Sequence, residues 1–139
     1  RSREEAKIYG AKAEEEVYVN IGPTGELSIA YQLFEKADKL DKGVGLESRR
    51  KDMKYRKTQA LELFENIASQ FPNSPKAPES LYRAALIQYY YFGDEAGAKE
   101  KLGKLVSDFP KSAFADYGKE LYEKIGREAL PATNISKGR

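Results

Sequence analysis

The stretch FPNSPKAPESLYRAALIQYYYFGD, residues 71–94, carries most of the signals that decide the fold. The proline after Phe71 ends one helix, because proline cannot continue it. Further prolines follow at once and indicate a turn before the next helix. An apolar helical run then extends to Gly93, which ends it. The same pattern returns thirty-eight residues later as FPKS, starting at Phe109, so the sequence indicates a structural repeat.

Three apolar positions recur at fixed spacing before these turns: a small residue, a bulky one four residues on, and another apolar one seven residues on. The clearest copies are Ala60, Phe64 and Ile67, and Ala98, Leu102 and Leu105; a weaker copy is Ala30, Phe34 and Ala37, with Lys42 where the proline would stand. A small residue lets two helices approach closely, and the larger ones continue one apolar stripe. We therefore expect Phe64 and Tyr82 in the core.

The remainder of the chain also has helical periodicity, and no segment shows strand alternation. The expected helices cover residues 3–19, 26–40, 46–70, 79–92, 95–108 and 113–127. We expect a turn near Lys54–Lys57. Ser74 and Ser112 are expected N-caps, and residues 131–139 a flexible tail.

Composition favours one globular domain, residues 1–130, without an obvious catalytic apparatus. The chain has 139 residues, a net charge of +2 and neither cysteine nor histidine. This composition excludes thiolate and imidazole chemistry and disfavours metal sites, and the small net charge gives no reason to expect nucleic-acid binding. The longest apolar run, 84–92, is too short to span a membrane. Because the chain begins at Arg1, we expect it to be a piece of a longer protein.

The repeated residues resemble the tetratricopeptide repeat, a helix–turn–helix unit of about 34 residues. The resemblance is good for residues 41–74 and 79–112 and weak for residues 3–40. It implies an all-α, right-handed superhelical stack of three helical hairpins with a C-terminal capping helix at 113–127. The two F-P-x-S turns resemble those of bacterial envelope members, such as the outer-membrane assembly lipoprotein and the Tol–Pal coordinator. We therefore expect a location in the bacterial envelope or periplasm, with the cytoplasm as the alternative.

The resemblance also implies a function: a non-catalytic scaffold that binds a protein or peptide segment in a concave groove, without cofactor, metal or small-molecule substrate. In the family, the first helix of each hairpin lines this groove. Carried over position by position, the expected binding residues are Lys42, Arg49, Met53, Arg83, Ile87, Tyr90 and Tyr91. Arginine and tyrosine are the residue types that dominate binding hot spots.

Other interpretations remain open for several of these residues. The basic run Arg49–Lys57 is most simply a solvated surface, or it faces a membrane or the rim of a membrane-protein partner if the chain is an accessory domain of such a protein. A glycan-active helical domain would need a cleft with two carboxylates. Asp38 and Asp41, or Glu14–Glu16, are paired carboxylates, but they lie in charge-rich helical segments without a cleft signal. The tyrosines at 82 and 89 are expected to pack between helices.

Overall fold

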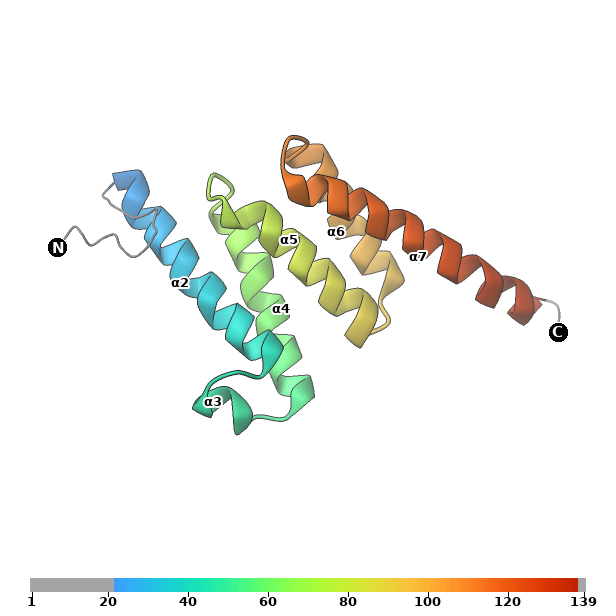
Figure 1. The fold of residues 1–139 in the computed structure, drawn as a ribbon, viewed down its shortest axis with the longest axis horizontal. Coiled ribbons are helices and arrows are strands. Elements are labelled where there is room, and N and C mark those ends of the chain that lie inside the picture. Colours follow the sequence, from blue (N-terminus) through green and yellow to red (C-terminus); the bar gives the residue numbers. More distant parts are fainter. Residues whose placement is uncertain (1–21, 138–139) are drawn as a thin grey trace.

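A computed structural model describes residues 22–137 of the chain, and these residues form helices joined by short turns, with no β-strand (Figure 1). The all-α helical-repeat fold expected from the sequence is confirmed. The elements are α2 (Gly22–Lys42), α3 (Leu46–Arg49), α4 (Met53–Gln70), α5 (Lys76–Leu86), the π-helical segment η1 (Ile87–Tyr91), α6 (Glu95–Asp108) and α7 (Ala113–Lys137).

Each long helix packs against the one before it and the one after it. α2 packs on α4, α4 on α5, α5 on α6 and α6 on α7. The described residues therefore contain two hairpins, α2 with α4 and α5 with α6, followed by α7. The predicted helix at residues 3–19 lies outside the described residues.

The helix boundaries within predicted unit 41–74 differ from the sequence expectation. The chain breaks at residues 50–52, before the expected Lys54–Lys57 turn, and α3 is only a short helical turn. Asp52 sets the break, because its carboxylate accepts a hydrogen bond from the N–H of Tyr55 at 2.8 Å and caps α4.

The pairing of residues 26–40 also differs from the expectation. The sequence predicted them as the second helix of a hairpin with residues 3–19. They belong instead to α2, which packs against α4 and is the first helix of the hairpin that these two helices form.

The two F-P-x-S turns adopt the same geometry. Phe71 and Phe109 have nearly equal backbone angles, φ −128° and ψ 57° against φ −131° and ψ 54°. In each turn the serine N–H donates to the phenylalanine carbonyl at 3.0 Å. The Ser74 hydroxyl accepts from the N–H of Lys76, and the Ser112 hydroxyl accepts from the N–H of the residue two positions on. The predicted N-cap at Ser112 is confirmed, because α7 begins at the next residue. At the first joint the N-cap position of α5 is Pro75, so the predicted cap Ser74 lies one residue earlier and its hydroxyl bonds the first helical residue. The repeated motif is a repeated helix-to-helix joint.

The recurring apolar positions form the core. Ala60, Phe64, Ile67, Ala98, Leu102 and Leu105 are all fully buried. Phe64 packs edge-on against Phe34 of α2, with ring centroids 5.4 Å apart. Tyr82 is only half-buried, because one side of its ring lies in the seam between α5 and α7.

The C-terminal helix is longer than expected. α7 continues through Pro131 to Lys137, where the sequence predicted a flexible tail. A proline removes one backbone hydrogen bond, but the residues on either side of it include the strong helix formers alanine and leucine. The end of α7 extends beyond the other helices (Figure 1).

Candidate partner-binding surface

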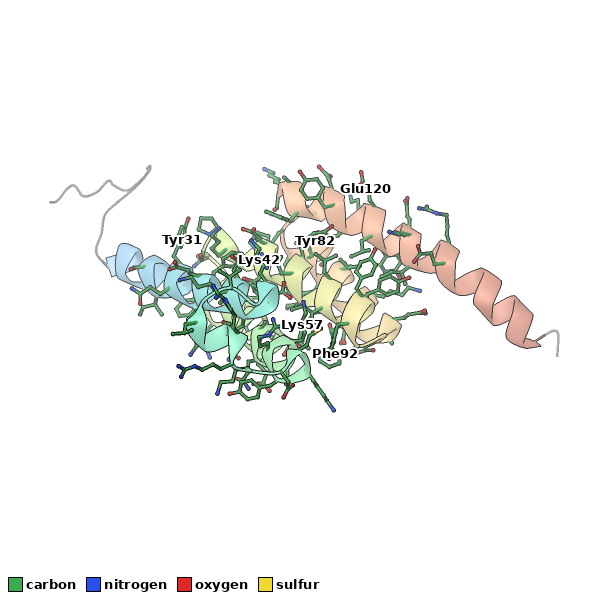
Figure 2. All side chains as sticks on the ribbon, turned by 60° about the horizontal axis from the view of Figure 1, so that its bottom comes forward. Tyr31, Lys42, Lys57, Tyr82, Phe92 and Glu120 are labelled. Carbon is green, nitrogen blue, oxygen red and sulfur yellow. The ribbon has the colours of Figure 1, made fainter. Side chains whose placement is uncertain are left out.

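The helices alternate between two layers (Figure 1). α2, α5 and α7 share one layer, in which α2 contacts α5 and α5 contacts α7. α4 and α6 each pack against two of these helices and form the other layer. We call the solvent-facing side of the first layer the first-helix face; it carries Tyr31, Asp38, Lys76, Tyr82, Tyr90, Tyr117, Glu120 and Lys124. Figure 2 shows Tyr31, Tyr82 and Glu120 along one side of the molecule.

Three of the predicted binding residues lie away from the middle of this face. Lys42 is the last residue of α2, where it is exposed and pairs with Asp38 at 3.1 Å. Arg49 ends α3 and Met53 begins α4, so both belong to the connector between the helices of the first hairpin. The structure therefore does not place these two on a first helix, because the predicted first helix of unit 41–74 does not form.

Arg83 is held within an interface between helices. Its guanidinium donates to the carboxylates of Asp38 at 2.8 Å and Asp41 at 3.0 Å, both on α2. It also lies over the rings of Phe34 and Phe64, 5.6 and 4.9 Å from their centroids. Its side chain is 15% exposed. Arg83 therefore joins α5 to α2 through one guanidinium nitrogen, which donates to both carboxylates.

The pKa values of this cluster reflect its mutual pairing. Burial opposes charge on both partners, but the hydrogen bonds of Asp41 and Asp38 outweigh it and raise the pKa of Arg83. In the same way, hydrogen bonds from Arg83 and Lys42 overcome burial and lower the pKa of Asp38. A general acid needs a raised pKa. The lowered pKa of Asp38 favours its charged form, which pairs with Arg83, and makes this carboxyl group a poor proton donor.

A π-helical turn separates residues that an ordinary helix would align. The N–H of Phe92 donates to the carbonyl of Ile87 at 3.2 Å, a five-residue step that widens the helix over Ile87–Tyr91. Ile87 faces inwards and is 4% exposed, so its predicted role in binding is not available on the surface. Tyr90 is rotated towards α7 and is 57% exposed. Tyr91 is also exposed and packs edge-on against Phe92, at the far end of the hairpin.

Aromatic rings line the seam between α5 and α7. Tyr82 of α5 lies 5.9 Å from Phe114 and 6.1 Å from Tyr117, both of α7, and the last two rings are 5.6 Å apart. Tyr117 is 49% exposed. Burial, followed by the neighbouring Tyr90 and Glu120, raises the pKa of Tyr82 above its ordinary value. We call Tyr82, Tyr89, Tyr90, Phe114 and Tyr117 the aromatic seam.

Charged residues of α7 hold the tyrosines of η1 in place. The Tyr90 hydroxyl accepts a hydrogen bond from the ammonium of Lys124 at 2.9 Å. The ring of Tyr90 packs edge-on against Tyr89, with centroids 4.8 Å apart. Tyr89 in turn donates to the carboxylate of Glu128, which raises the pKa of Tyr89 to about 12. Hydrogen bonds with α7 thus hold the exposed end of the seam.

The first-helix face continues onto α2. Tyr31 is 47% exposed, and the ammonium of Lys76 at the start of α5 lies 5.4 Å from its ring centroid. A shallow groove of about 400 Å³ runs beside them, lined by Ser28, Tyr31, Gln32, Phe34, Glu35, Asp38 and Lys76. The face therefore combines exposed tyrosines with charges of both signs from its first helix to its last.

Residues 79–112, which make up most of the second hairpin, match the family described as tetratricopeptide repeat. Neither a curated protein nor a solved structure gave a significant match to the chain.

The matched residues comprise most of α5, η1 and α6, so α5 corresponds to the first helix of such a repeat and α6 to the second. Counting back along the stack, α4 is in the position of a second helix and α2 in that of a first helix. Tetratricopeptide repeats generally mediate protein–protein interactions and are typically non-catalytic scaffolds.

Sequence reasoning missed two contributors to the first-helix face. The α2 residues near Tyr31 were overlooked because α2 was assigned to the second helix of a hairpin. The α7 residues Tyr117 and Lys124 were overlooked because the helix after the tetratricopeptide repeat was treated as a cap. Their spacing, with exposed residues seven positions apart on one helix, was a signal that could have been used.

Among residues 22–137, no group of acidic side chains is arranged to hold a metal ion, and no helix is long and apolar enough to cross a membrane.

Proposed function

We propose that this chain is a non-catalytic interaction module that binds a peptide segment of a partner protein along the first-helix face. One observation carries the proposal: α2, η1 and α7 each present an exposed tyrosine on this face, Tyr31, Tyr90 and Tyr117. Tyrosine supplies a large contact area at low entropic cost and is enriched at interface hot spots.

The arrangement of the seam supports binding by a preformed surface. Lys124 holds Tyr90 through a hydrogen bond to its hydroxyl, and Tyr82 packs against Phe114 and Tyr117. Side chains that are already ordered lose little freedom on binding, which favours affinity. The seam is apolar with charges of both signs beside it, so it suits an extended or helical segment with apolar anchors and mixed charge.

The proposed cellular setting is a bacterial envelope assembly, in the periplasm or attached to a membrane protein. Its support is the resemblance of the two F-P-x-S turns to those of bacterial envelope proteins. The two turns share one hydrogen-bonding geometry. A cytoplasmic setting is the alternative. A glycan-active role has weaker support, because the two nearest carboxylates, Asp38 and Asp41, are both engaged by Arg83.

A peptide-display selection tests the proposal. Peptides selected on the wild-type domain are measured against the double variant Tyr90→Ala/Tyr117→Ala and against Tyr122→Ala. Tyr122 is a matched control for Tyr117, since both are exposed tyrosines of α7. The Tyr122 ring lies beside Lys99 of α6. Each seam substitution should weaken binding by about 1–3 kcal/mol. If the control weakens binding as much as the double variant, or if neither does, the first-helix face is not the binding site.

A further inference from the structure

The connector between α2 and α4 is longer than hairpin closure requires. It covers residues 43–52 and includes α3, whereas the equivalent connector between η1 and α6 covers only residues 92–94. Both connectors join the first helix of a hairpin to the second. The shorter one shows that the hairpin closes without an insertion, so the additional residues are free to form a surface of their own.

This connector is anchored at its base. The guanidinium of Arg56 donates to the carbonyl of Leu40 at 2.8 Å, and the ammonium of Lys57 reaches both the carbonyl and the carboxylate of Asp41, at 3.0 and 2.6 Å. These cations satisfy the last carbonyls of α2, where positive charge is favoured. Gly43 has φ 71°, a conformation that suits glycine. The connector is therefore a shaped element of the fold.

Beneath α3 lies a recess of about 380 Å³ between α2, the connector and α4. It is lined by Lys36, Lys39, Leu40, Val44, Gly45, Leu46, Ser48, Lys51, Tyr55 and Gln59. This lining contains three lysines and no carboxylate, although the whole chain carries a net charge of only +2. Lys39 pairs with Glu35 outside the recess at 3.5 Å, both side chains being exposed, whereas Lys36 and Lys51 have no such partner among the described residues. Its apolar members include Leu46 and Val44, which are 68% and 50% exposed. The recess thus combines uncovered apolar surface with a local excess of positive charge.

The rim of the recess extends this positive field. Arg49, Arg50 and Lys54 are exposed beside it, and none of the described carboxylates pairs with them. The ammonium of Lys51 lies 5.1 Å from the ring centroid of Tyr55, and both residues line the recess. Clustered charges of one sign raise the local concentration of oppositely charged ligands and speed their association.

We propose that this recess is a second docking site, which binds an acidic segment of a protein partner through carboxylates on its lysines and an apolar side chain on Leu46 and Tyr55. The concave shape favours a protruding side chain over a flat lipid surface, which would touch only the rim. This site is separate from the peptide site on the first-helix face and does not depend on it. Two docking sites on one module would let it hold two segments of one partner, or two partners, together.

A fluorescence-polarisation titration tests the second site. The probe is a fluorescein-labelled peptide that alternates pairs of Glu with Leu or Phe, and the control peptide has Lys in place of every Glu. The variant Lys36→Gln/Lys39→Gln/Lys51→Gln removes the recess lysines. A matched variant, Lys104→Gln/Lys111→Gln/Lys119→Gln, removes the same charge from exposed positions elsewhere. Wild type should bind only the acidic probe, and the recess variant should bind it about tenfold more weakly.

The outcomes separate the alternatives. The matched variant should change affinity by less than about twofold at physiological salt, because distant surface charges are screened. Equal weakening by both triple variants, or no binding of the acidic probe by wild type, would overturn the proposal. Lysine-dependent binding to vesicles of phosphatidylcholine and phosphatidylserine, without peptide binding, would assign the recess to a membrane and also overturn the proposal.

The apolar contact has a test of its own. Tyr55→Ala, at a half-exposed ring, should weaken binding of the acidic peptide, whereas Tyr90→Ala/Tyr117→Ala should leave this binding unchanged. Unchanged binding by Tyr55→Ala would contradict the proposed contact between an apolar side chain of the peptide and Tyr55.

Discussion

Arg83 and Asp38 are 45 positions apart in the sequence, yet the guanidinium of Arg83 donates to the Asp38 carboxylate at 2.8 Å. This contact joins the first helix of one hairpin to the first helix of the next. It fixes the relative position of α2 and α5, and with it the spacing of the exposed tyrosines on the first-helix face. The architecture of the proposed site thus depends on an ion pair beneath it.

Replacing Arg83 should therefore destabilise the fold. Arg83→Met keeps much of the packing over Phe64 but leaves two carboxylates without their shared partner. We expect a loss of about 1–3 kcal/mol in the free energy of unfolding, the usual cost of a hydrogen-bonded charge left without its partner. Urea denaturation measures it, with Arg49→Met on the exposed connector as the control. Equal stability of the two variants would mean that the Arg83 cluster contributes nothing to the fold.

The same cluster should make stability depend on pH in the acid range. The pKa of Asp38 is lowered below its ordinary value of 3.8. A carboxyl whose pKa is depressed by folding stabilises the native state above its unfolded pKa, and this contribution is lost as pH falls through the folded value. The free energy of unfolding should therefore fall below about pH 4. Urea titrations from neutral to acid pH should show a shallower fall for Asp38→Asn. An identical slope in the variant would contradict the pairing.

The burial of one aromatic residue of α4 predicts a large loss of stability when it is replaced. Phe64 is fully buried between α2 and α5, against the ring of Phe34 and the guanidinium of Arg83. Phe64→Ala should cost about 3–5 kcal/mol. Tyr122→Ala, at an exposed ring, should cost less than about 0.5 kcal/mol. Thermal and urea denaturation compare the two, and a loss under about 1 kcal/mol at position 64 would show that the core register is wrong.

The packing of α7 gives a further prediction. Gly118 is buried, and a Cβ atom there would come 2.9 Å from the Leu105 side chain of α6. Gly118→Val should therefore separate α7 from α6 or strain the contact, at a cost of about 1–3 kcal/mol. The exposed Gly103 of α6, where an added Cβ meets nothing, serves as the control. Denaturation midpoints that move equally for both valine variants would refute the close packing at 118.

The parts of the fold that the sequence predicted are those with a local cause. The core triads follow from helical spacing, and the two F-P-x-S turns follow from proline and serine chemistry. The break at Asp52 was misplaced because several residues of that basic stretch satisfy helical periodicity, and only the cap hydrogen bond to Tyr55 selects the boundary. The pairing of α2 with α4 depends on contacts between segments distant in sequence, which spacing does not encode.

The candidate site was predicted less well for a specific reason. A helix of uniform pitch aligns Arg83, Ile87 and Tyr90 on one face. The π-helical turn at Ile87–Tyr91 rotates Tyr90 towards α7, while the other two stay against α2 and α4. Three adjacent tyrosines gave no local signal for that wider turn. The pairing of Tyr90 with Lys124, which depends on α7, was therefore beyond a sequence-based prediction.

An NMR titration locates a bound peptide on the protein surface and so shows whether the first-helix face binds it. A peptide selected on the wild-type domain is added to isotope-labelled protein, and amide shifts are followed. We expect the largest changes at Tyr31, Tyr90 and Tyr117, with little change at the exposed Glu62 of α4 and Gly103 of α6. Changes concentrated on α4 and α6, with those three tyrosines unmoved, would contradict binding at this face.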